Sequence, residues 1–255
     1  MLRPRVIPCL LLKGSGLVKT RQFADPKYVG DPNNAIRIFN EKSADELIVL
    51  DIEASRRGRG PNFEMIEQFA GESYMPVCYG GGVTTVDQAA RILALGVEKI
   101  SIQSAAIDDF SLIREIASRF GSQSVVLSVD VRRGRFGQNR LISSTRGRPE
   151  KRAWLDWMTA GVDAGVGEVL LTSVNREGTM TGLDLALIRA AAGATAVPLI
   201  ANGGVGSLSD INEGLEAGAS AVAVGSYFVL HGPHRAVLIT YLDESHFIEL
   251  GENQT

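Results

Sequence analysis

The sequence predicts an α/β fold in which one domain forms a closed (β/α)8 barrel, and three observations predict it. The first is a duplication, because Pro76–Ala106 and Pro198–Phe228 match at a shift of 122 residues and both contain Gly-Gly-Val. The second is an alternation of eight β-rich runs with helical patterns, which is typical of parallel βαβ units. The third is the length of 255 residues, which fits one such barrel.

Each expected strand is an apolar run that ends at a polar residue or a glycine, as strands covered on both faces of a parallel sheet require. In chain order the runs are Arg5–Leu11, Glu46–Ile52, Pro76–Tyr79, Lys99–Gln103, Ser124–Asp130, Glu168–Ser173, Pro198–Ala201 and Ala219–Val224. Apolar residues at helical spacing follow two of them, over Asp87–Leu95 and Leu208–Ala217, and a glycine follows each helix. A doubly wound open sheet is the alternative.

The duplication divides the chain into two half-barrels, roughly residues 1–122 and 123–255. A shift of this length excludes a stacked repeat, whose units run about 20–50 residues. No change in composition marks a linker, so we expect residues 1–255 to form a single domain.

Bulk composition narrows the function classes. The net charge of −3 disfavours a general nucleic-acid binder, and no stretch reaches the length of a membrane span. Cys9 and Cys78 both lie in apolar runs, which fits a reducing compartment better than a disulfide framework. We therefore expect a cytoplasmic protein that binds neither nucleic acid nor a membrane.

One segment departs from the strand–helix pattern. Arg132–Arg152 carries seven arginines and one lysine against a single glutamate, and it follows the fifth strand. It is therefore expected at the C-terminal rim of the barrel, where active sites of this fold lie. It is either a solvated hairpin with scattered charges or an electropositive lid over a polyanionic ligand.

The Gly-Gly turns predict two phosphate sites, because glycines after strands let backbone N–H groups approach an anion. Each turn is matched by a hydroxyl after the next strand. The residues are Gly81, Gly82, Gln103 and Ser104 in one copy, and Gly203, Gly204, Gly225 and Ser226 in the other. Two sites at one barrel mouth indicate either a phosphorylated small molecule with a phosphate at each end or the evolutionary remnant of a site for one.

Carboxylates at the carboxyl ends of strands are candidates for catalysis. Asp130 ends the fifth strand and Asp51 the second, although either could instead cap the following helix or pair with an arginine. By the two-fold relation, the first strand should carry a polar counterpart of Asp130, but Leu11 stands there. No metal site is expected, because the three histidines lie beyond the eighth strand without a cluster of further ligands.

These segments together resemble the cyclase subunit of imidazole glycerol phosphate synthase over nearly the whole chain. The resemblance rests on RVIPCL, LVKT, DELIVLDI, YGGGV, EKISIQSAA, GSQSVVLSVDVRR, GEVLLTSVNREGT and IANGGVG, in the family's order. It implies a TIM barrel that accepts a doubly phosphorylated nucleotide precursor and needs no cofactor. It also implies a heterodimer with a glutaminase subunit, which docks at the N-terminal face and sends ammonia through the barrel's centre.

The resemblance assigns roles to further residues. Lys19 matches a ligand-contacting lysine and Glu98 an acidic docking position for the glutaminase, while Ser173 and Gly178 fall among the mouth and ligand-binding residues. Two acids and two bases at strand starts match a gate that closes the bottom of the barrel, although ordinary ion pairs are the alternative. The gate residues are Arg5, Glu46, Lys99 and Glu168.

The catalytic pair is where the sequence departs from the family. The family uses an aspartate after strand one and another after strand five as general acid and base; Asp130 supplies the second, and Leu11 replaces the first. The family's strand-four asparagine is Gln103, and its strand-six loop aspartates are Asn175 and Glu177. The resemblance thus implies retained phosphate sites and ammonia path with altered cyclase chemistry.

PCLLLK, VGDPNNAIRIFNEK and HGPHRAVLITYL resemble a branch of the family found with surface-polysaccharide genes. The branch implies a subunit that supplies ammonia for amidating a nucleotide-linked sugar. A working cyclase of histidine biosynthesis is one alternative. A non-catalytic barrel that activates its glutaminase as a scaffold is another.

Overall fold

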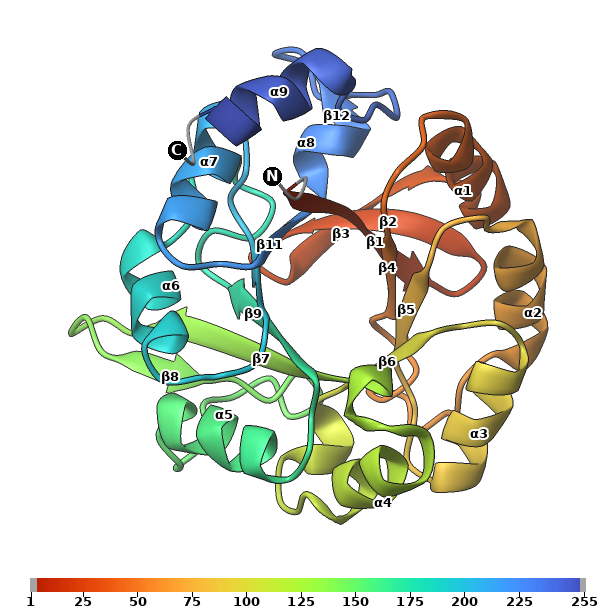
Figure 1. The fold of residues 1–255 in the computed structure, drawn as a ribbon, viewed down its shortest axis with the longest axis vertical. Helices are drawn as coiled ribbons and strands as arrows, with labels where there is room; N and C mark the ends of the chain where they lie inside the picture. The colour runs from red at the N-terminus through yellow and green to blue at the C-terminus, as the bar shows by residue number, and fades with distance from the viewer. Residues whose placement is uncertain (1–3, 253–255) are drawn as a thin grey trace.

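Eight parallel strands close into a barrel in the computed structural model, which describes residues 4–252 (Figure 1). They are β1 (Arg5–Lys13), β4 (Leu47–Asp51), β5 (Val77–Gly80), β6 (Lys99–Ile102), β7 (Val125–Arg133), β9 (Glu168–Ser173), β10 (Leu199–Asn202) and β11 (Ala221–Val224). Each pairs in parallel with the next, and β11 pairs with β1. The predicted (β/α)8 barrel is confirmed, and the open sheet is wrong.

An outer layer of helices covers the strands. The helices are α1 (Pro32–Glu41), α2 (Phe63–Glu72), α3 (Val86–Ala94), α4 (Ser111–Phe120), α5 (Trp154–Asp163), α6 (Leu185–Ala192), α7 (Leu208–Glu216), α8 (Ser226–Val229) and α9 (Glu244–Glu252), with 3-10 turns η1 (Ser104–Ala106) and η2 (Ser122–Ser124). The duplicated helices α3 and α7 begin alike, because Thr85 and Ser207 each form a capping box.

The core has two layers because successive side chains of a strand point to opposite sides. The larger layer packs between strands and helices, with Phe39, Phe69 and Trp157 fully buried in it. The smaller layer fills the barrel's interior with apolar side chains. Its buried members are Ile7, Cys9, Ile48, Cys78, Val126, Leu170, Ile200, Ala221 and Ala223. Across the described chain, no helix is both long and apolar enough to cross a membrane.

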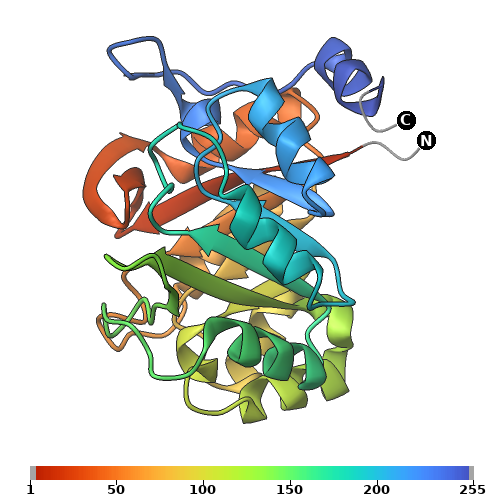
Figure 2. The same ribbon diagram turned by 90° about the vertical axis from the view of Figure 1, so that its left-hand side faces the viewer.

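Three hairpins lie at the carboxyl ends of the barrel strands (Figure 2), and sequence reasoning anticipated only the one that begins the basic segment. The first joins β2 (Gly16–Arg21) to β3 (Ala24–Gly30) and extends β1. In the second, β8 (Asn139–Leu141) pairs with the end of β7. The third joins β12 (Leu230–His231) to β13 (Ala236–Val237). We call residues 16–30, 131–141 and 230–238 the mouth hairpins.

Candidate functional site

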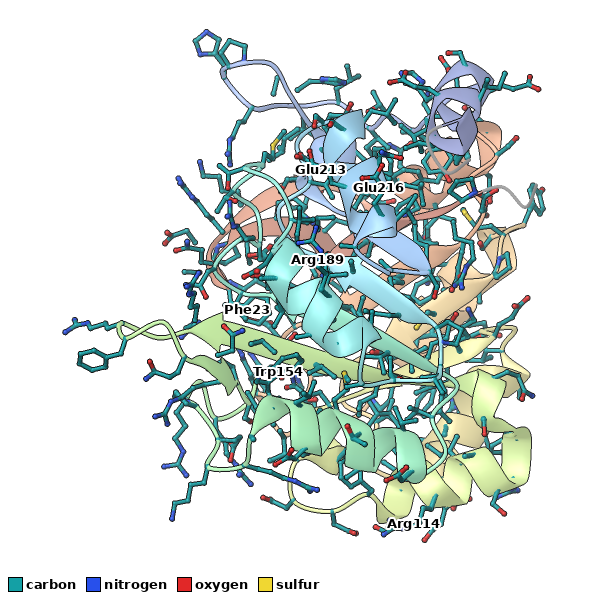
Figure 3. All side chains as sticks on the ribbon, turned by 60° about the vertical axis from the view of Figure 1, so that its left-hand side comes forward. Phe23, Arg114, Trp154, Arg189, Glu213 and Glu216 are labelled. Carbon is teal, nitrogen blue, oxygen red and sulfur yellow. The ribbon has the colours of Figure 1, made fainter. Side chains whose placement is uncertain are left out.

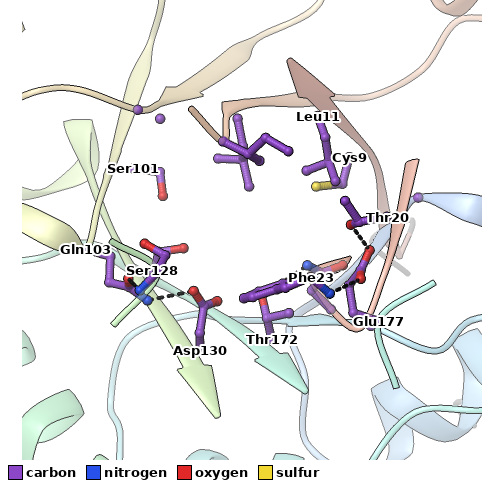
Figure 4. A pocket seen from close by; sticks show the side chains of 18 of the residues that line it. Cys9, Leu11, Thr20, Phe23, Ser101, Gln103, Ser128, Asp130, Thr172 and Glu177 are labelled. Atoms are coloured by element: carbon purple, nitrogen blue, oxygen red, sulfur yellow. Dashed lines mark hydrogen bonds between the residues drawn. The ribbon is translucent and has the colours of Figure 1, made fainter. Parts of the chain in front are cut away.

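A cavity of about 160 Å³ opens at the C-terminal mouth of the barrel (Figure 4). The carboxyl ends of parallel strands meet there, so residues far apart in sequence line one space. Most predicted site residues line it: Leu11, Lys19, Asp51, Gly81, Gly82, Gln103, Ser104, Asp130, Gly178, Gly203, Gly204, Gly225 and Ser226.

Asp130 is the buried acid of this pocket. Its side chain is 7% exposed, and burial raises its pKa to about 6, although hydrogen bonds from Gln103 and Thr172 oppose the shift. Gln103 Nε2 donates to Asp130 Oδ2 at 2.7 Å, while Gln103 Oε1 accepts from the backbone N–H of Ser144 at 2.9 Å. Gln103 therefore holds both the acid and the neighbouring loop. A carboxyl with a pKa near neutrality can exchange protons with a ligand.

Leu11 lies across the pocket from Asp130 (Figure 4). It sits opposite Leu50 in the β1–β4 ladder, and both pack against the apolar interior layer that contains Cys9. Burial raises the pKa of the Cys9 thiol to about 11, so this thiol offers no thiolate base at neutral pH. Asp130 therefore has no acid or base facing it from the position of Leu11 on β1.

The two Gly-Gly turns have backbone geometry that only glycine accommodates. Gly81 and Gly203 have φ of 127° and 97°. A Cβ would lie 2.5 Å from the backbone oxygen of Asp51 at Gly81, and 2.8 Å from that of Ser173 at Gly203. Each turn therefore packs its backbone closely against the preceding strand, as an anion site built from main chain requires.

The hydroxyls beside the two turns differ. Ser104 Oγ lies 3.3 Å from Ser144 Oγ, so it has a partner. Ser226 is 7% exposed, and its Oγ has no hydrogen-bond partner within residues 4–252. An unpaired buried hydroxyl costs about 1–3 kcal/mol. The turn beside Ser226 is thus the part of the pocket that most needs a ligand.

The β2–β3 hairpin covers one side of the pocket and is fastened by Glu177. Glu177 Oε1 accepts from Thr20 Oγ1 at 2.8 Å, and Oε2 accepts from the backbone N–H of Phe23 at 3.0 Å. Lys19, which is 6% exposed, donates to the backbone oxygen of Cys9 at 3.2 Å. A Cβ on Gly225 would lie 2.2 Å from Lys19 Nζ, so glycine leaves room for the lysine.

Two predicted mouth residues have other surroundings than expected. Ser173 is buried but does not line the pocket. Side chains alternate along β9, so its neighbour Thr172 faces the pocket instead. Asp51 lines the pocket, but its Oδ1 accepts from the backbone N–H groups of Glu53 and Ala54, both at 2.9 Å. Asp51 therefore holds the turn that follows β4, a structural role like the helix cap considered for it.

Four charged side chains close a ring at the opposite end of the barrel. Arg5 contacts Glu46 and Glu168 at 2.7 Å each, and Lys99 contacts the same two carboxylates at 2.8 Å each. Burial opposes the charge of Lys99, yet the carboxylates raise its pKa above the usual value. The pKa of Glu168 is likewise lowered, because hydrogen bonds from Arg5 and Lys99 outweigh its burial. The ring is a single mutually satisfied network.

Glu98 is exposed beside this ring, immediately before β6. It is thus available to a partner at the N-terminal face. Within residues 4–252, no group of three His, Cys, Asp or Glu side chains is placed to hold a metal ion.

The basic segment Arg132–Arg152 forms the β7–β8 hairpin and the loop after it. None of its eight cationic side chains lines the pocket; of this segment, Ser144 alone does. The structure therefore favours the hairpin interpretation over an electropositive lid on the pocket. Arg56, which the sequence did not single out, lines the pocket and donates from Nε to the backbone oxygen of Ser144 at 2.8 Å.

Sequence reasoning also missed Phe23 and Asn202 as pocket residues. Phe23 reaches the pocket from a hairpin tip that lacks an apolar pattern. Asn202 ends β10 at the position that Asp130 and Thr172 occupy in their strands, and its Nδ2 donates to Thr172 Oγ1 at 3.1 Å. Strand-end position was the signal that could have identified Asn202.

The chain is similar in sequence to proteins of one known family. The model of a family described as histidine biosynthesis protein matches residues 5–233. A Pseudomonas aeruginosa protein provisionally named imidazole glycerol phosphate synthase subunit hisF2 is 56% identical over 244 residues, which cover 95% of this chain and 97% of that protein. A provisionally named subunit HisF of Leptospira borgpetersenii is 47% identical, covering 94% and 96%. Imidazole glycerol phosphate synthase subunit HisF of Gluconacetobacter diazotrophicus is 40% identical, covering 89% and 88%.

Proposed function

The chain belongs to the histidine biosynthesis protein family, as a paralogue of the cyclase subunit of imidazole glycerol phosphate synthase, and from this premise we propose that it delivers ammonia to an acceptor other than that enzyme's nucleotide. In this proposal a glutaminase subunit docks at the N-terminal face and forms a heterodimer with the chain. The ammonia released from glutamine crosses the barrel and amidates a nucleotide-linked sugar used in surface polysaccharide synthesis.

Leu11 is the observation that carries the proposal. Cyclisation by a general acid and a general base needs two proton-transferring groups, and Leu11 and Leu50 line the side of the pocket across from Asp130. Loss of one such group typically costs about 10²–10⁴-fold in rate. Meanwhile the gate ring, the apolar interior and the two glycine turns are intact. The parts retained are those that ammonia transport and anion binding require.

The path proposed for ammonia runs from the ring to the pocket. The interior between them is filled by small and apolar side chains, among them Ala221, Ala223 and Cys78. Neutral ammonia can enter such a space, whereas an ammonium ion pays a large desolvation cost. The ring of Arg5, Lys99 and the two glutamates must open for entry, and Glu98 beside it supports docking of the glutaminase on this face.

A transfer experiment tests the proposal. The chain is combined with a glutaminase and with the enzymes encoded beside its gene, and it receives glutamine labelled with heavy nitrogen in the amide, in an excess of unlabelled ammonium. We expect heavy nitrogen in an amidated sugar product. Label in imidazole glycerol phosphate instead would support the histidine enzyme and refute the proposal.

A working cyclase remains the second candidate, because Asp130 keeps a pKa of about 6 and both glycine turns line its pocket.

A further inference from the structure

Exposed apolar side chains gather on the mouth hairpins. Within residues 4–252, six large hydrophobic side chains are exposed: Tyr28, Tyr74, Phe136, Val237, Leu238 and Ile248. Four of these belong to the mouth hairpins. Phe136 at the tip of the β7–β8 hairpin is 92% exposed and Tyr28 on β3 is 69% exposed. Exposed apolar side chains concentrated on one face mark an interaction site more often than scattered ones do.

The β7–β8 hairpin that bears Phe136 is also strongly basic. The segment Arg132–Arg152 carries a net charge of +7 in a chain of net charge −3, so the rest of the chain carries −10. Arg133, Arg135 and Arg140 are exposed, and none forms an ion pair with a carboxylate of the described chain. Concentrated unpaired charge of one sign attracts a surface of the opposite sign.

The hairpin is held in place although it projects from the barrel (Figures 2 and 3). The backbone N–H of Arg133 donates to Asn175 Oδ1 at 2.7 Å, which ties the base of the hairpin to the loop after β9. A prepositioned arm loses less entropy on binding than a free loop does. Because none of its cations lines the pocket, the ligand of the pocket does not account for them.

We propose that the mouth hairpins dock the enzyme that receives the ammonia, through an acidic rim that meets the β7–β8 arginines and an apolar recess that takes Phe136. This inference rests on the proposed function and names its missing partner. A protein is favoured over a nucleic acid because the exposed side chains beside the arginines are apolar, and aromatic and arginine side chains form the anchors of protein interfaces. Docking at this face would cover the pocket and pass ammonia between the two proteins without release.

Two variants test the surface. One replaces Arg133, Arg135 and Arg140 by glutamine, and the other is Phe136→Ala. Matched controls are the glutamine variant of Arg114, Arg119 and Arg189, which are exposed on outer helices, and Ile248→Ala on α9. Figure 3 labels Arg114 and Arg189. The proteins encoded beside this chain's gene are purified separately. The affinity of each variant for each of them is then measured by sedimentation or in a surface-binding assay.

We expect one of these proteins to bind, with Kd raised about tenfold or more by each mouth variant and unchanged by the controls. Binding to the wild-type chain should weaken with added salt because exposed charges are screened. In the heavy-nitrogen transfer assay, the mouth variants should lower labelled product severalfold while glutaminase binding stays normal.

Different failures are distinguishable. If a neighbouring enzyme receives glutamine nitrogen equally well from the mouth variants, the docking inference is wrong and the proposed function stands. If no labelled sugar product forms with the wild-type chain, the proposed function is wrong. The docking inference, which rests on it, is then wrong as well. Binding of duplex DNA, or self-association of the chain, that is lost in the same variants would reassign the surface and overturn the inference.

Discussion

At the scale of the residue, two aspartates at strand ends have different roles because their surroundings differ. One carboxylate oxygen of Asp51 accepts hydrogen bonds from two backbone N–H groups, whereas Asp130 is buried and accepts a hydrogen bond from a glutamine amide. The sequence marks both positions equally, since each is a carboxylate after an apolar strand. Only the three-dimensional structure separates them, because the separation depends on loops that close over one and not the other.

Asp130→Asn should raise the free energy of unfolding, and more so at higher pH. The folded-state pKa is about 6 against an ordinary 3.8, so folding favours the neutral carboxyl. The resulting penalty is absent below the ordinary value and complete above the folded value. The gain from asparagine should therefore be about 1 kcal/mol larger at about pH 7.5 than at about pH 5. Denaturant unfolding at both pH values measures it, and an equal gain at both would contradict a raised pKa.

Ser104 and Ser226 differ because the Ser104 hydroxyl has a hydrogen-bond partner and the Ser226 hydroxyl has none within residues 4–252. Ser226→Ala should raise the melting temperature in phosphate-free buffer, because it removes a buried hydroxyl without a partner. It should also reduce the rise in melting temperature that inorganic phosphate produces, since a ligand stabilises only by binding the folded state. Ser104→Ala, which loses its contact with Ser144, serves as comparison and should not gain stability. An unchanged phosphate response in Ser226→Ala would remove this hydroxyl from the phosphate site.

At the scale of the element, the barrel strands could be predicted, whereas the β2–β3 and β12–β13 hairpins could not. Each barrel strand is an apolar run covered on both faces, and each expected run coincides with an observed strand within a few residues at either end. The β2–β3 hairpin has mostly exposed residues on β3 and positive φ at Gln22 and Phe23. Its position depends on tertiary contacts with Glu177, which no local pattern encodes.

Glu177→Gln should loosen the β2–β3 hairpin. The bonds from Thr20 and Phe23 use different carboxylate oxygens, and glutamine replaces one of these oxygens by an NH2 group that cannot accept. Loss of a hydrogen bond to a charged acceptor should speed amide hydrogen exchange at Phe23 by about tenfold. The Val169 amide, which donates to the backbone oxygen of Pro198 in the barrel, is an internal reference. Glu213→Gln on α7 is the matched control (Figure 3). Equal exchange at Phe23 in both variants would contradict the role of Glu177 in holding the hairpin.

At the scale of the whole molecule, the barrel has two ends with different chemistry. A ring of four compensated charges closes the bottom, and a pocket with the buried Asp130 and two glycine turns opens at the top. The duplicated sequence predicted the glycine turns, since each half contributes one. The projecting arms around the mouth were not predictable as a surface, because their exposed residues come from three separate segments.

We propose that Leu11 has removed the cyclase step from a pocket that keeps Asp130 and both glycine turns. The measurement is an ammonium-driven assay for imidazole glycerol phosphate formation from the doubly phosphorylated nucleotide precursor, with the unmodified chain beside Leu11→Asp. Ammonium makes the glutaminase unnecessary. We expect no turnover by the unmodified chain and turnover at least about 100-fold higher in Leu11→Asp, because the variant restores an acid opposite Asp130. Substantial turnover by the unmodified chain would contradict the account and identify a working histidine enzyme.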